Sequence, residues 1–194
     1  MVTSLKLADV VAGALGLPPR TVVQHLRNLQ KAELISFKGY GRGAAHMSPH
    51  DAARLLIAAA GSDFVKDSLT TLRGFGALLP IRTALGEGQH ITLEDHLAGL
   101  LTKLASEASA EPGSGAAQLG HLDLSLVSVA NIAAPSHAAI LRWGPDASSI
   151  CFAAQQWKRP ITSVGDYAQL VKGAGLIREK HLTREALQAV AHSL

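Results

Sequence analysis

The sequence predicts a mainly α-helical protein with a small antiparallel β part, and three patterns indicate it. Through residue 107, apolar side chains recur at helical spacing in several segments that Gly, Pro or Ser residues separate. A stretch of small residues, 106–120, then carries Gly, Ser and Pro and indicates a loop. Beyond it, residues 122–129 alternate apolar and polar side chains, which is typical of a strand with one buried face. We therefore expect an N-terminal helical part and a C-terminal α+β part.

The first helix is expected over residues 4–15, with Ser4 as its N-cap. Gly16 and Pro18 follow, and together they indicate a turn that ends this helix. A second helix is expected over residues 19–32, because Pro is favoured in the first helical turn, where its missing N–H is not needed. The apolar residues at helical spacing in the two helices are Leu5, Ala8, Val11, Ala12, Leu15, Val22, Val23, Leu26 and Leu29, and Leu34 continues the same spacing just beyond the second helix.

The polar side of the second helix carries side chains of the kinds that bind DNA. Arg and Lys pair with phosphates, and Arg, Gln and Asn hydrogen-bond to base edges. We therefore predict that residues 19–32 form a recognition helix that enters the major groove of double-stranded DNA. The side chains expected to face DNA are Arg20, Thr21, Gln24, His25, Arg27, Asn28 and Lys31.

A short strand, residues 35–37, and a hairpin tip, residues 38–43, are expected after this helix. Gly alternates there with Lys38, Tyr40 and Arg42, so an extended chain would place these three side chains on one side. Such a tip would bring two cations and an aromatic ring to the DNA backbone. The alternative is a flexible loop that only joins two helices, since Gly-spaced polar residues are common in loops.

A pattern at the end of the second helix resembles that of winged-helix transcription regulators. It has the form LxxLxxAxLI, in Leu26, Leu29, Ala32, Leu34 and Ile35. In that family the pattern ends the recognition helix and leads into the wing, so the resemblance implies a winged helix-turn-helix DNA-binding domain over residues 1–47. The family usually has Gly where this chain has Glu33, and it often has one more helix before the recognition helix. Residues 41–62 also resemble, more loosely, regulator-type proteins of bacterial mobile elements.

Residues 48–107 are expected to form a helical core or dimerisation region. Ser48 and Asp51 have the spacing of a reciprocal cap at the start of one helix. Further helices are expected over residues 63–78 and 92–107. The last of these carries a stripe of leucines, which favours a helix of the protein core over a helix at a dimer interface. In an obligate dimer the same helix could serve both purposes. The stripe consists of Leu93, Leu97, Leu100, Leu101 and Leu104.

Residues 119–194 are expected to form a small α+β domain. Its β part is an antiparallel meander, because Gly and Pro turn signals separate short runs of apolar and β-branched residues. The expected strands lie at residues 122–129, 138–143 and 149–155, and the expected helices at residues 163–172 and 183–193.

The positive charge of the chain is concentrated at the N-terminus. Residues 1–46 hold six basic and two acidic side chains, whereas the remainder holds twelve basic and thirteen acidic ones. A basic module on a near-neutral body is the pattern expected of a nucleic-acid-binding protein. We see no secretory signal and no apolar run of the ~18–20 residues that span a bilayer, and therefore expect a cytoplasmic protein that does not enter a membrane.

No pattern of reactive side chains predicts an enzyme, a cofactor or a metal site. His46 and His50 have the spacing of two metal ligands on a helix, but the HExxH context is missing and a Pro lies between them. His96 follows Asp95, yet no nucleophile accompanies the pair. The single cysteine, Cys151, excludes an intramolecular disulfide and is expected to be a buried, unreactive thiol.

These observations favour a sequence-specific DNA-binding transcription regulator that acts as a homodimer. One recognition helix reads only a few base pairs, so binding two half-sites supplies affinity and specificity. The body would provide the dimer contact or bind a small effector. One alternative is a DNA-recognition subunit for phage packaging or replication that assembles into a ring. A second alternative is a winged-helix module that binds proteins rather than DNA.

Overall fold

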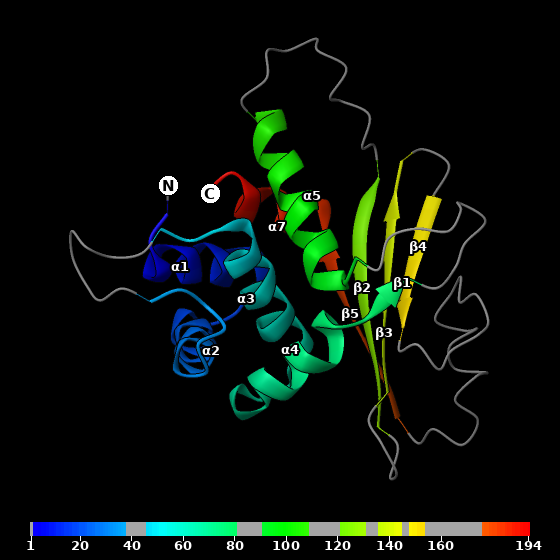
Figure 1. Cartoon of the computed structure of the whole chain (residues 1–194), viewed down its shortest axis with the longest axis horizontal. Coiled ribbons are helices and arrows are strands. Elements are labelled where there is room, and N and C mark those ends of the chain that lie inside the picture. The colour runs from blue at the N-terminus through cyan, green and yellow to red at the C-terminus, as the bar shows by residue number, and fades with distance from the viewer. Residues whose placement is uncertain are drawn as a thin grey trace.

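The computed structural model describes residues 2–37, 46–80, 91–108, 121–130, 136–144, 148–153 and 176–194. These residues form an α+β fold in which helices cover one face of an antiparallel sheet (Figure 1). The helices are α1 (Ser4–Leu15), α2 (Pro19–Lys31), α3 (Pro49–Gly61), the 3₁₀ turn η2 (Val65–Asp67), α4 (Ser68–Gly76), α5 (Leu93–Ala108) and α7 (Arg184–Ala191). The strands are β1 (Leu79–Pro80), β2 (Leu122–Ala130), β3 (Ser136–Trp143), β4 (Ser148–Ala153) and β5 (Leu176–Thr183).

Helix α1 has the expected bounds, but its N-cap is Thr3 rather than Ser4. The Thr3 carbonyl already accepts the N–H of Leu7 at 2.9 Å, which is the first bond of the helix. The helix ends at Gly16, whose φ of 64° lets the N–H of Leu17 return to the carbonyl of Ala12 at 2.9 Å. This left-handed residue turns the chain sharply, and α2 begins a few residues later.

Helix α2 ends in the same kind of turn, although no glycine is present. Glu33 adopts a φ of 59°, and the N–H of Leu34 bonds to the carbonyl of Leu29 at 3.0 Å. Gly would be favoured at this position, because Gly adopts a left-handed backbone without steric cost. Glu33 therefore adopts a left-handed backbone conformation that is strained for a residue with a side chain.

The expected helix over residues 63–78 is shorter in the structure. The η2 turn occupies Val65–Asp67, and α4 begins only at Ser68 and ends at Gly76. Leu79 and Pro80 then form the short strand β1, which pairs with β4. Pro is tolerated there because β1 is an edge strand and its missing N–H removes no ladder bond from the interior of the sheet.

The leucine stripe of α5 lies inside the chain. All five leucines are buried, and α5 packs against α3 and α7. The prediction of a core helix is confirmed, and the stripe offers no exposed seam to a second copy. A dimer contact would therefore have to use another surface.

The sheet has the strand order β1-β4-β3-β2-β5, with antiparallel neighbours throughout. The meander β2-β3-β4 confirms the three strands expected from the sequence. Two strands were missed, β1 and β5. Strand β5 pairs with β2 over its whole length, so that Leu182 lies beside Leu124 and His181 beside Ser125. The helix expected over residues 163–172 lies outside the described residues.

One hydrophobic cluster extends through the described molecule, from residue 2 to residue 191. It joins α1 and α2 to α3, to α5 and to one face of the sheet. Helix α7, at the end of the chain, packs against α1 at its beginning, and the two termini lie close together in Figure 1. The two N-terminal helices therefore share their core with the body, and α3 is a third helix packed against both. No described helix is long and apolar enough to cross a membrane.

Candidate nucleic-acid interface

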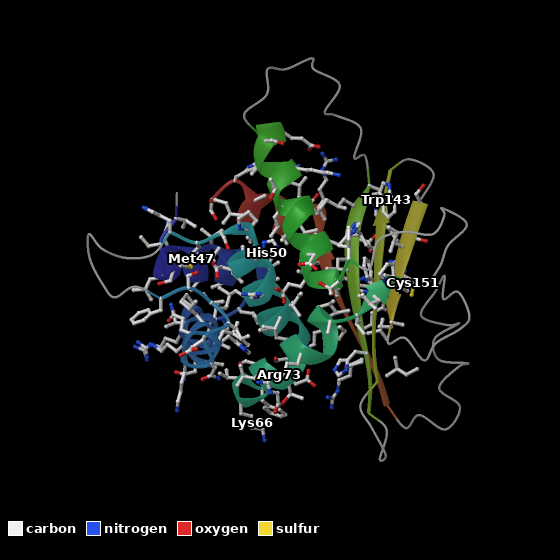
Figure 2. The ribbon with its side chains drawn as sticks, in the orientation of Figure 1. Met47, His50, Lys66, Arg73, Trp143 and Cys151 are labelled. Carbon is white, nitrogen blue, oxygen red and sulfur yellow. The ribbon has the colours of Figure 1, made fainter. Side chains whose placement is uncertain are left out.

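Helix α2 lies at the edge of the molecule, and polar side chains project outward from it (Figure 2). One of its faces carries a row of exposed polar side chains. The row follows the i, i+4, i+7, i+11 spacing, which places its members one above the other on a helix. It contains three cations and one amide, and α2 contains no acidic residue. We call it the α2 stripe; its members are Arg20, Gln24, Arg27 and Lys31.

A shallow hollow of about 410 Å³ runs beside the first half of the α2 stripe. Pro19 and Val23 supply its apolar lining, and three members of the stripe surround them. Methylene stems of Arg can cover such apolar surface while their guanidinium groups stay in water. Arg20 and Arg27 are both exposed, so their guanidinium groups can reach outward from α2.

Two side chains expected to face DNA point into the protein instead. His25 is only 3% exposed, and its Nδ1 shares a 2.8 Å hydrogen bond with the hydroxyl of Ser68. Asn28 is half-buried and donates from Nδ2 to the carbonyl of Val65 at 2.9 Å. These predictions were wrong, because η2 and α4 cover the flank of α2 that holds both side chains. The half-buried Thr21 lies on the same flank.

Burial also decides the protonation of His25. Removal from water lowers the pKa of the imidazole below its ordinary value, and the nearby charge of Lys180 lowers it further. A neutral imidazole can form the Nδ1 hydrogen bond to Ser68, and it leaves no buried charge without a partner. The His25 side chain therefore holds α2 against α4 as a neutral group near pH 7.

The chain that follows α2 is fixed by two side chains of α3. Asp51 is 3% exposed, and its Oδ1 accepts the backbone N–H of Ser36 at 3.1 Å. Its Oδ2 accepts the N–H of Ser48 at 2.9 Å, which completes the expected capping box of α3. One turn later, Arg54 donates to the carbonyl of Leu34 at 2.6 Å and to Glu94 of α5 at 2.7 Å.

The expected strand at residues 35–37 is not formed; the prediction was wrong for these residues. The Ser36 N–H is used by a carboxylate instead of a partner strand. Lys38, Tyr40 and Arg42 lie outside the described residues, so the expected wing stays a prediction. On the far side of that segment, the N–H of Met47 bonds to the carbonyl of Val2 at 2.9 Å, and His46 pairs with Thr3 in an isolated bridge.

A second polar cluster, missed by the sequence analysis, lies on β2, β3 and β5. Arg142 donates to Asp123 at 2.9 Å and to the hydroxyl of Ser125 at 3.1 Å. Ser125 Oγ also shares a 3.0 Å hydrogen bond with Nδ1 of His181, whose Nε2 lies 3.2 Å from Glu179. In the sequence, only the polar residues at positions i and i+2 of β2 could have indicated this cluster. Their partners belong to strands that are distant along the chain.

The chemistry of this cluster is limited by burial. Ser125 has no exposed surface, so its hydroxyl cannot meet a substrate in this arrangement. Its bonds to Arg142 and His181 satisfy a polar group inside the sheet.

Among the described residues, no group of three or more His, Cys, Asp or Glu side chains could hold a metal ion. His50, one of the two histidines with the spacing of metal ligands, instead pairs with Asp95 at 3.4 Å.

No family model, no curated protein and no solved structure matches this chain. The features that bear on function are therefore the α2 stripe and the contacts that hold α2 in place.

Proposed function

We propose that this protein is a sequence-specific regulator of transcription that binds double-stranded DNA through α2 and acts as a homodimer in the cytoplasm. The observation that carries the proposal is the α2 stripe. It presents three cations and one amide in a single exposed line, with no acidic side chain on the same helix. Such a face complements the phosphate charge and the base edges of the major groove.

The size and support of α2 favour this use. A helix with its side chains is ~10–12 Å wide, and the major groove of B-DNA is ~12 Å wide, so one helix fills it. In the groove, Arg20 or Arg27 could bond to a guanine edge and Gln24 to an adenine edge. His25 and Asn28 support the proposal indirectly, because their bonds to Ser68 and Val65 hold α2 against α4 and η2.

Binding to DNA selected from a random pool tests the proposal directly. We expect a duplex to be enriched, and Arg20→Ala together with Arg27→Ala to weaken binding by at least tenfold, as the loss of ~1–3 kcal/mol per contact implies. Arg73→Ala together with Lys103→Ala removes the same charge from exposed positions outside α2 and is the matched control. Equal affinities of the two double variants would rule out α2 as the recognition helix.

The oligomeric state separates the proposal from its alternatives. Native mass measurement is expected to give a dimer of the 20.3 kDa chain. Two recognition helices would then read two half-sites about one DNA turn apart. A ring of about eight to twelve copies, as closed cyclic symmetry allows, would favour a packaging subunit. A chain that binds no DNA at any salt concentration would favour a protein-interaction module.

A further inference from the structure

We propose that Lys66 makes a second DNA contact, to a backbone phosphate on the ridge beside the groove that α2 enters. This inference rests on the proposed function of α2. It concerns the segment of residues 63–67, which contains η2 and which we call the η2 segment. From the sequence this segment was expected to be helical, and no role in binding was expected of it.

The η2 segment is fixed against α2 by hydrogen bonds. Asn28 donates from Nδ2 to the carbonyl of Val65 at 2.9 Å. The hydroxyl of Ser68 bonds to the same carbonyl, and His25 bonds to that hydroxyl at 2.8 Å. The position of Lys66, the next residue after Val65, is therefore set by α2 rather than by a free loop.

The contact point on α2 lies next to the α2 stripe. Residues three and four apart are neighbours on a helix surface, so Asn28 borders both Gln24 and Lys31. Val65 thus contacts a side chain, Asn28, that is the immediate neighbour of the α2 stripe. Because α2 fills a groove of about its own width, an element packed on its flank meets the phosphate ridge that forms the groove wall.

The exposed side chains of the η2 segment suit a phosphate. Lys66 is exposed, and its ammonium lies 5.3 Å from the ring centroid of Phe64. Phe64 is 62% exposed, the most of any large hydrophobic side chain in the described part of the chain. A cation–π contact of this kind stabilises an exposed lysine only weakly, and the exposed ammonium can still donate to a phosphate oxygen.

The neighbouring acidic group is already neutralised. Asp63 pairs with Lys180 at 2.9 Å and also with Arg178, both on β5. The hydrogen bond from Lys180 is the main reason that the pKa of Asp63 lies below its ordinary value, so this carboxylate stays paired near pH 7. Lys180 also donates to the carbonyl of Ser62 at 2.9 Å, which ties the start of the segment to the sheet. Asp67, the remaining acid, is half-buried at the start of α4.

A salt titration of DNA binding tests the inference. Lys66→Ala should weaken binding to a selected duplex and to random duplex by the same factor, because phosphate contacts carry no sequence information. It should also lower the slope of log affinity against log salt by ~0.9, the value for one phosphate. Lys66→Arg should keep the wild-type slope. Lys103→Ala on α5 removes an exposed cation from an element that does not pack on α2 and is the matched control.

The outcomes separate this inference from the proposed function. If Arg27→Ala weakens binding while Lys66→Ala and Lys103→Ala leave the same slope as wild type, the contact at Lys66 is refuted and the role of α2 stands. If Lys66→Ala weakens only the selected duplex, Lys66 reads a base and the phosphate contact is wrong. A wild-type chain that binds no duplex overturns both proposals. Circular dichroism of each variant checks that the fold is kept.

Discussion

Asp51 and Ser36 lie fifteen positions apart and are joined by a 3.1 Å hydrogen bond from the Ser36 backbone N–H to Oδ1 of the carboxylate. The other oxygen of the same carboxylate holds the N–H of Ser48 at 2.9 Å. One buried side chain thus fixes the chain on both sides of the segment expected to form the wing, and it also caps α3.

Replacing Asp51 by Ala is therefore expected to be costly. Loss of a helix cap costs ~0.5–2 kcal/mol, and a hydrogen bond to a charged group contributes ~1.5–3 kcal/mol. We expect the free energy of unfolding to fall by about 2–4 kcal/mol on these grounds, measured by urea denaturation. Asp9→Ala, at an exposed position of α1, is the matched control and should change stability little. Similar stabilities for the two variants would mean that the Asp51 bonds contribute nothing.

Glu33→Gly is expected to stabilise the protein. A left-handed backbone costs ~1–2 kcal/mol for residues other than Gly, and Glu33 has a φ of 59°. Gly also gains freedom in the unfolded chain, which offsets ~0.5–1 kcal/mol of that relief. A rise in the melting temperature checks the sum. Gly16→Ala, at a φ of 64°, makes the reverse change and should lower the melting temperature; a fall for both variants would contradict the strain at Glu33.

Gly74→Ala should destabilise the contact between α4 and the sheet. A Cβ at Gly74 would lie 2.7 Å from Cε1 of His137, whose ring already packs edge-on against Phe75 at 4.5 Å. Overpacking of this kind costs ~1–3 kcal/mol. Gly99→Ala on α5 meets no atom within 4 Å and should instead stabilise its helix slightly. Thermal unfolding of both variants is the measurement, and equal shifts of the same sign would argue against close packing at Gly74.

The stability of the protein is expected to fall as the pH falls from 7 to 5. Burial lowers the pKa of His25, His96 and His137 below the ordinary value of 6.5. Lys180 adds to the effect at His25, and Lys103 adds to it at His96. Below about 6.5 the unfolded chain therefore binds more protons than the folded chain, so stability is fully present above that pH and is lost below it.

Urea denaturation at pH 7.5 and at pH 5.5 measures this loss. His137→Gln removes one of the three titrating groups, so the difference in unfolding free energy between the two pH values should become smaller. Thr70→Gln, at an exposed position of α4 that carries no titrating group, is the control and should leave the difference unchanged. Stability that rises on acidification would contradict the direction of all three pKa shifts. The paired carboxylates Asp63 and Asp95 add a separate loss only at lower pH, because their pKa values lie below 3.8.

Helices whose ends are set by neighbouring residues were predictable from the sequence. The start of α3 follows from Ser48 and Asp51, and its end from Gly61, because capping bonds join residues only a few positions apart. The same holds for Thr183 at the start of α7. The meander β2-β3-β4 was visible because its strands follow one another and its turns carry Gly and Pro.

Strand β5 was missed because its sequence shows no alternation of apolar and polar residues. Arg178, Glu179 and Lys180 are consecutive charges, and only pairing with β2 makes them a strand. That pairing sends both Lys180 and Arg178 toward Asp63. Charges of this kind are stabilised by partners far along the chain, and a sequence pattern does not record those partners.

The sequence by itself determined that α2 is an amphipathic helix with a basic polar side, because the 3.6-residue period fixes which side chains share a face. It did not determine which part of that polar side stays in water. Tertiary structure decided this: η2 and α4 cover the flank that holds His25 and Asn28, and leave Arg20, Gln24, Arg27 and Lys31 exposed. The physical reason is that polar side chains tolerate burial only where hydrogen-bond partners meet them, and those partners, Ser68 and Val65, come from about forty residues away along the chain.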